Sequence, residues 1–219
     1  MPFLSRLSGV SLLVLCVLSL PVAAAIGPQS VQSLAFTVMR NGDEIGTHTL
    51  KFTRSGDMLD VDIKTNIEVS IAFITVFRFV HQGHEIWNAG KLINLESTTN
   101  DDGKQHTLVV SRIQNTLSVV GDGKSSSVDT GILPASLWNP RLVQTPQATL
   151  LNTLDGSRMA VQVTAVGEDM VAGPSGPAPA KHYSMRGQLD RDLWYDAAGT
   201  LVKMQLKGSD GSEIQYVLK

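Results

Sequence analysis

The sequence has almost no cysteine, and it has no long hydrophobic run beyond its first 25 residues. The single cysteine, Cys16, lies in the N-terminal apolar stretch, so the rest of the chain cannot form a disulfide. A domain without crosslinks must be held together by burial alone, even in a compartment where disulfides form. No later apolar stretch approaches the roughly 20 residues that a transmembrane helix needs, so we expect no span there.

An excess of charge of either sign is also missing. The chain has 18 basic residues, one of which (Arg6) falls in the first 25 positions, against 20 acidic ones. Proteins that bind nucleic acid or anionic membranes through charge carry a basic patch or a basic excess. The balance therefore argues against nucleic acid as a partner.

Catalytic signatures are scarce too. There is no Gly-x-Ser-x-Gly turn of a hydrolase, and Ser175 lies in a glycine-proline loop with no helix to follow it. The carboxylates of Asp101, Asp102, Asp190 and Asp192 fall at expected turns or strand edges, where they are solvated. We predict no catalytic residue and no cofactor.

The first 25 residues have the layout of a secretory signal peptide. Arg6 gives a positive start, an apolar run extends over residues 10–20, and Ala23-Ala24-Ala25 offers the small-x-small pattern of a cleavage site. The apolar run is about half the length of a membrane span. We expect residues 1–25 to be a signal peptide, residues 26–219 to form one domain, and the protein to be periplasmic or secreted.

Alternation of apolar and polar residues dominates the remaining chain and predicts strands. The clearest run places Leu59, Val61, Ile63, Ile67 and Val69 on one face. Successive side chains of a strand point to opposite faces, so we expect one side of this segment to be buried and the other to be exposed to solvent. Near the C-terminus the same pattern groups Val202, Met204 and Leu206 on one face.

Tight-turn signals separate these runs at short intervals. They are Asn41-Gly42, Asp102-Gly103, Asp122-Gly123, Asp155-Gly156 and Asp210-Gly211. Each pairs a residue that tolerates positive φ with glycine, as two-residue hairpin turns require. Short connections cannot make parallel crossovers. The fold class is therefore mainly β, with a single antiparallel meander sheet.

Residues 132–153 interrupt the alternation. They are rich in leucine and contain Pro134, Pro140 and Pro146, which prevent a long helix. We expect one or two short helices or turns that pack apolar side chains, including Trp138, onto the sheet. Residues 167–179, rich in glycine and proline, are expected to form a loop within the same domain.

The stretch from Ile71 to Trp87 is apolar on both faces. One face carries Ile71, Phe73, Phe77, Phe79 and His81, and the other carries Ile74, Val76 and Val80. Such a strand must be covered on both sides, by the chain itself, by a partner, or by a hydrophobic ligand. The candidate ligand-binding residues are Phe73, Phe77, Phe79, His81, Trp87, Trp138 and Trp194.

The histidines do not form a metal signature. His81 and His84 are three residues apart, so on a regular strand they point to opposite faces, although Gly83 could introduce a bulge. No third ligand is identifiable, and zinc sites have three or four. We predict no metal site and expect His48 and His106 to be buried structural residues.

Several motifs together resemble a known family. They are Asn41-Gly42-x-x-Ile45-Gly46, the segment from His81 to Trp87, Asp101-Asp102-Gly103, Leu137-Trp138-Asn139, and Asp192-Leu193-Trp194-Tyr195-Asp196-x-x-Gly199-x-Leu201. The chain resembles a family of uncharacterised bacterial exported β-rich proteins with a domain of unknown function. The resemblance implies that the mainly-β fold is a single curved antiparallel meander sheet, an open or half β-barrel. This shape is similar to the half-barrels of outer-membrane lipoprotein carriers, which hold acyl chains in an apolar hollow.

The leading functional hypothesis is therefore the binding of an apolar or lipid-like molecule in a concave sheet. A non-enzymatic structural or protein-interaction module of the envelope is the first alternative. The second is a small hydrolase-type enzyme that uses His81 or His84 with a nearby carboxylate.

Overall fold

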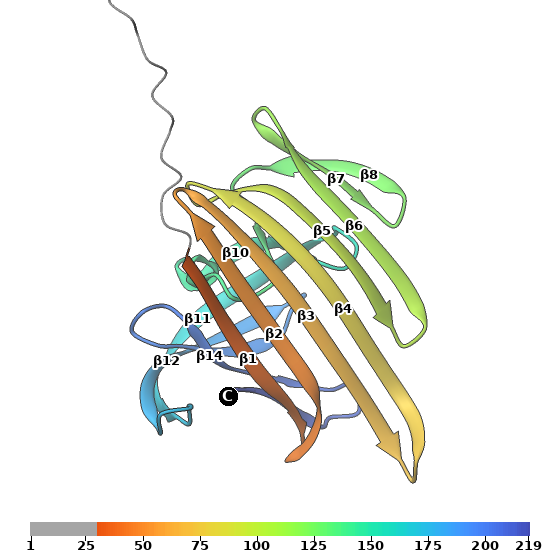
Figure 1. The fold of residues 1–219 in the computed structure, drawn as a ribbon, viewed down its shortest axis with the longest axis vertical. Helices are drawn as coiled ribbons and strands as arrows, with labels where there is room; N and C mark the ends of the chain where they lie inside the picture. Colours follow the sequence, from red (N-terminus) through yellow and green to blue (C-terminus); the bar gives the residue numbers. More distant parts are fainter. Residues whose placement is uncertain (1–29) are drawn as a thin grey trace, which may run out of the picture.

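The computed structural model describes residues 30–219, which form one β-sheet (Figure 1). Its strand pairs are antiparallel except for one short parallel pair, in which Leu133 and Pro134 lie beside Leu150 and Leu151. The expected signal peptide, residues 1–25, and the expected start of the domain at Ile26 lie outside the described residues. Long strands β1–β4 cross the front of the molecule in Figure 1, and β10–β12 lie behind them. The predicted mainly-β class is confirmed.

The first eight strands are successive hairpins. They are β1 (Ser30–Arg40), β2 (Asp43–Ser55), β3 (Met58–Ile71), β4 (Ile74–Asn88), β5 (Lys91–Asp101), β6 (Lys104–Ile113), β7 (Thr116–Gly121) and β8 (Lys124–Asp129). Asn41-Gly42, Asp102-Gly103 and Asp122-Gly123 form three of their turns, with positive φ at both residues of each pair. The prediction is therefore confirmed for these three pairs, where positive φ favours Asn, Asp and Gly. It is wrong for Asp155-Gly156 and Asp210-Gly211, which lie in longer connections, at residues 152–157 and 208–212.

The remaining strands form a second series. They are β9 (Leu133–Pro134), β10 (Gln147–Leu151), β11 (Arg158–Val171), β12 (Ala178–Gly187), β13 (Arg191–Tyr195), β14 (Leu201–Lys207) and β15 (Glu213–Leu218). One short 3₁₀ helix, η1 (Pro140–Val143), precedes β10. Residues 132–153 thus contain a short helix, as expected, together with strands β9 and β10, which the sequence did not predict.

The two series join at β1 and β15, in the middle of the sheet. The strand order is β8-β7-β6-β5-β4-β3-β2-β1-β15-β14-β13-β12-β11-β10-β9. The edge strands β8 and β9 are therefore consecutive in the sequence, separated only by residues 130–132. An extended residue spans at most about 3.6 Å, so this short connection cannot bridge a large distance. The sheet must therefore curl until β8 and β9 come close together, although no ladder of hydrogen bonds joins them.

The loop between β10 and β11 fills the space inside this curl. The Ser97 hydroxyl of β5 donates to the carbonyl of Thr153, and the Arg158 guanidinium donates to the carbonyl of Ser127 at 3.1 Å. The backbone of Asp155 passes so close to Gly121 of β7 that no side chain fits between them. The loop thus ties the two edges of the sheet together from the inside.

One core fills the concave side of the sheet. It contains the alternating residues predicted for β3, among them Leu59, Val61 and Ile63, and it continues through β5–β7 and the leucines of residues 137–151. On β14, however, the predicted face is wrong for Val202. A bulge shifts the register between β13 and β14, so that Leu201 and Met204 point inward and Val202 packs outside. A bulge places two residues opposite one, which breaks strict alternation.

Candidate functional site

An apolar groove of about 530 Å³ opens at one end of the concave side. One wall is the inner face of the β3–β4 hairpin, with Ile67, Val69, Val76, Phe77 and Phe79. The opposite wall comes from the last two strands and contains Leu206, Ile214 and Tyr216. These strands are far apart in the sequence, and the curl of the sheet brings them to face each other.

The length of the β3–β4 hairpin explains the first wall. Toward the β3–β4 turn the inward side chains of this hairpin are less buried than those in the core. Phe77 and Phe79 are half-buried there, whereas residues further along β4 are fully buried. A bulge opposite Val69 and Ser70 makes Val76 an extra residue that also lines the groove. The groove is thus an unfilled continuation of the core.

Charged side chains line the other rim. Arg40, at the end of β1, forms an ion pair with Asp210 in the β14–β15 turn and donates to the Ser212 hydroxyl at 3.2 Å. Two hydrogen bonds from Ser212 and the guanidinium of Arg40 hold the pKa of Asp210 well below its usual range. Arg191, at the start of β13, also lines the groove. Polar groups therefore concentrate at one side of an otherwise apolar hollow.

A row of alternating histidine and threonine crosses the inner end of the groove. His48, Thr65, His81, Thr99 and His106 are successive cross-strand neighbours on β2–β6, and all are buried. The Nδ1 atoms of His48 and His81 lie 2.8 and 2.7 Å from the threonine hydroxyls beside them, and that of His106 lies 2.7 Å from Asp122. Hydrogen bonding satisfies these buried rings, as expected for structural histidines.

Burial keeps two of these histidines uncharged. Removal from water lowers the pKa of His48 and of His81 from the ordinary 6.5 to about 4, and in His48 the neighbouring His81 adds to the effect. The row connects directly to the groove, because Phe79 stacks on His81 and Tyr216 meets His48 edge-on, with ring centroids 5.5 Å apart. The uncharged imidazole rings of His48 and His81 therefore lie next to aromatic side chains of the groove.

A buried carboxylate lies deeper in the core. Glu85 is 1% exposed, and its Oε2 accepts hydrogen bonds from the indoles of Trp87 at 2.8 Å and Trp138 at 3.0 Å. Its Oε1 has no hydrogen-bond partner among the described residues. Burial raises the pKa of the Glu85 carboxyl, and the Ser136 side chain and then the two indoles oppose that rise. Glu85 fastens the segment that carries Trp138 to β4.

Replacing Glu85 with alanine should lower the free energy of unfolding by about 2 kcal/mol. The change would leave two indole N–H groups without their acceptor, and an unmet buried donor costs roughly 1–3 kcal/mol. Glu85→Gln keeps an acceptor oxygen at the same place and should cost much less. Urea unfolding at neutral pH compares the two variants, and equal losses would contradict the acceptor role.

The structure brings some of the predicted ligand-binding residues together and separates others. Phe77 and Phe79 line the groove, and His81 lies just behind Phe79. Trp87 and Trp138 pack edge-to-face in the core, with ring centroids 5.6 Å apart, away from the groove lining. Phe73 lies in the turn between β3 and β4, with φ of 69° and its side chain fully exposed. It does not line the groove.

Trp194 belongs to a separate cluster outside the core. It is buried with Val171 and Ala180, stacks on His182 at a centroid distance of 4.2 Å, and donates to Asp169. Its neighbour Tyr195 points inward and donates to the carbonyl of Leu137 at 2.6 Å. These adjacent aromatics therefore face opposite sides of their strand.

His81 and His84 do not meet. His81 is 6% exposed on the inner face, whereas His84 is well exposed and pairs with Asp62 at 2.8 Å and with Asp60 at 3.7 Å. No bulge at Gly83 re-aims either ring, because β3 and β4 stay in regular register there. Across residues 30–219, no group of three or more His, Cys, Asp or Glu side chains is placed to hold a metal ion.

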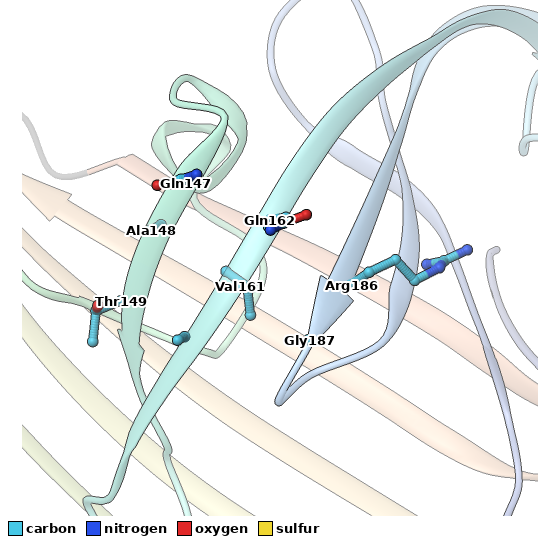
Figure 2. Close-up of a pocket in the computed structure, with 8 residues that line it drawn as sticks. Gln147, Ala148, Thr149, Val161, Gln162, Arg186 and Gly187 are labelled. Atoms are coloured by element: carbon cyan, nitrogen blue, oxygen red, sulfur yellow. The ribbon is translucent and has the colours of Figure 1, made fainter.

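A second depression, of about 610 Å³, covers β10, β11 and the end of β12. Figure 2 shows that its polar side chains point in different directions, with Gln147 and Arg186 extending away from each other. The Arg186 guanidinium already forms an ion pair with Asp192, so it is less available to a ligand. Since the lining groups do not converge on a common point, this depression is a weaker candidate than the groove.

Comparisons with known proteins bear on the family and the fold. A family model described as "Domain of unknown function (DUF6134)" matches residues 36–219. No curated protein matches the chain. The crystal structure of a β-barrel-like protein of domain of unknown function DUF1849 from Brucella abortus is similar, with a TM-score of 0.56 and 14% identity over 90% of this chain and 98% of that one. The predicted resemblance to a β-rich family of unknown function is thus confirmed. No helix in residues 30–219 is long and apolar enough to cross a membrane.

Proposed function

The chain belongs to the DUF6134 family, and we propose that this member binds an apolar or lipid-like molecule in the groove between the β3–β4 and β14–β15 hairpins. The observation that carries the proposal is the hollow itself. It has a volume of about 530 Å³, and its walls are aromatic and aliphatic. Small-molecule sites commonly occupy roughly 300–1,000 Å³ and combine an apolar lining with a few polar groups.

The exposure of the groove residues supports this function. Phe77 and Phe79 remain half-buried although the neighbouring core is fully packed. Covering apolar surface yields about 25 cal/mol per Å² removed from water. A ligand that covers both rings would therefore gain binding energy from surface that the chain leaves exposed.

We place this activity in the periplasm or outside the cell. The support comes from the sequence alone: the positive start, apolar run and small residues of positions 1–25 have the layout of a signal peptide. Native mass spectrometry of protein purified from the periplasm, followed by solvent extraction, tests both the location and the bound ligand. A reproducible extra mass that leaves with organic solvent is expected, and a clean apo mass after incubation with lipids would contradict it.

Replacing Phe77 with aspartate should reduce binding of an apolar probe at least tenfold, because a carboxylate in the groove must lose water that the probe does not replace. The uncharged fluorophore N-phenyl-1-naphthylamine provides the readout. Phe73→Asp is the matched control: the same change on the same hairpin, but at a side chain that lies outside the groove. Normal binding by a folded Phe77→Asp variant would show that the β3–β4 wall does not contact the ligand.

The same pair of variants addresses the protein-interaction alternative. That function is favoured by the exposed apolar tip of the hairpin, where Phe73 and Ile74 are 105% and 68% exposed. Contiguous exposed apolar surface often marks a contact site. An interaction through the tip requires Phe73 and not Phe77, which is the reverse of the dependence expected for a ligand in the groove.

A further inference from the structure

The groove contains one cation that the chain does not neutralise. Arg191 lines it from the start of β13, and no salt bridge within residues 30–219 includes this side chain. Its Nη1 donates to the carbonyl of Asp190 at 2.7 Å, which leaves most of the five guanidinium N–H donors for other acceptors. A half-buried guanidinium without a carboxylate is costly unless something pairs with it.

The other cation of the groove shows the contrast. Arg40 faces the same hollow, but it forms an ion pair with Asp210 and also donates to Ser212. The charged residues lining the groove are these two arginines and Asp210, so the lining keeps a net positive charge that belongs to Arg191. Burial also lowers the pKa of Arg191, an effect that Tyr216 and Asp190 oppose.

We propose that the ligand is a single-chain amphiphile whose anionic head group pairs with Arg191 while its hydrocarbon chain lies along the β3–β4 wall. This inference rests on the proposed function and names the class of molecule bound. A guanidinium can bind a carboxylate or a phosphate through two parallel hydrogen bonds. The apolar residues Ile67, Phe77 and Phe79 form a wall beyond that point for the chain. Charge complementarity thus fixes which end of the molecule lies at β13.

The test uses three molecules with the same sixteen-carbon chain: palmitate, hexadecyl phosphate and uncharged monopalmitin. Each competes with N-phenyl-1-naphthylamine for the whole protein. We expect the wild-type protein to bind one or both anions at least tenfold more tightly than monopalmitin, and the tighter anion identifies the head group. This selectivity requires no variant, so it does not depend on the folding of any mutant.

Arg191→Gln should abolish that selectivity, so that palmitate, hexadecyl phosphate and monopalmitin compete with similar affinities. Arg191→Lys retains the charge and should restore part of it, because lysine lacks the planar fork of arginine. Equal binding of anionic and neutral molecules by the wild-type protein, with the fluorophore still bound, would overturn the head-group inference and leave the proposed function standing. Failure of every probe to bind would overturn both.

Discussion

Replacing Gly121 with alanine should lower the free energy of unfolding by about 3 kcal/mol, at the upper end of what an inserted methyl group costs in a packed site. A Cβ at this position would lie 1.8 Å from the carbonyl oxygen of Asp155 and 2.5 Å from its carbonyl carbon. Real carbon atoms do not approach so closely, so either β7 or the loop between β10 and β11 must move.

Hydrogen bonds within the loop between β10 and β11 limit how far it can move. Asn152 donates to Ser157 twice, from its backbone N–H to the carbonyl at 2.8 Å and from its side-chain amide to the hydroxyl at 3.3 Å. The N–H of Gly156 in turn donates to the carbonyl of Asn152 at 3.0 Å. Gly156 itself has φ of 74° and leaves no room for a side chain beside Val119. The strain of Gly121→Ala therefore falls on the contact that closes the sheet.

Gly131→Ala is the matched control for this variant. It lies in the short connection between β8 and β9, where a Cβ would meet no atom within 4 Å and φ is not positive. We expect a change within about 0.5 kcal/mol, as is usual for surface positions. Urea unfolding of both variants provides the measurement. Equal stability of Gly121→Ala and Gly131→Ala would show that the loop does not close the sheet.

Acidification should destabilise the protein between about pH 6.5 and pH 4. His48 and His81 have a pKa near 4 in the folded state and near 6.5 when unfolded. In this window the unfolded chain binds more protons than the folded one, so the free energy of unfolding decreases as pH falls. At about 1.4 kcal/mol per pH unit, each histidine accounts for roughly 3 kcal/mol.

Other titrating groups act elsewhere or in the opposite direction. The pKa values of Asp122 and Asp210 lie below the ordinary 3.8, so the stability that these carboxylates contribute is lost below pH 4. Glu85, with its raised pKa, takes up a proton more readily when folded and opposes the histidines. A variant is therefore needed to isolate the contribution of one ring.

His81→Asn keeps a polar atom near the Thr99 hydroxyl but removes the titrating ring. Urea unfolding at pH 7 and pH 4 should show a pH-dependent loss smaller by roughly 3 kcal/mol than in the wild-type protein. An identical pH dependence in the wild-type and His81→Asn proteins would contradict the assignment to this buried histidine.

Local pattern was enough to predict most of the sheet. Alternation placed Val61 and Ile63 in the core, and the Asn-Gly and Asp-Gly pairs marked real turns. Strand β10 was missed because leucines spaced among prolines do not alternate, and its partner β11 is what makes it a strand. Val202 was misplaced because a bulge depends on the register with β13, which no single strand encodes.

Only the β3–β4 wall of the candidate site was predicted from the sequence. The two-sided apolar stretch indicated Phe77 and Phe79, because unpaired apolar faces need a cover. Nothing near Arg191 or Leu206 in the sequence indicated a groove, since these residues meet the β3–β4 hairpin only after the sheet curls. Phe73 was included because the stretch from Ile71 to Trp87 was interpreted as one strand. Pairing of Ile71 with Ile74 instead places Phe73 in the turn between β3 and β4.

The seam between β1 and β15 has a consequence for how the chain folds. Every other pairing in the described sheet joins strands adjacent in the sequence, whereas Phe36 pairs with Leu218. Contacts between distant residues carry the largest loop-closure entropy and form slowly. The two series of hairpins can each assemble on their own, but the central seam must wait for the last strand. Until then each half exposes an unpaired edge, β1 or β15, in the middle of the future sheet, and that interval is when the chain is most open to aggregation.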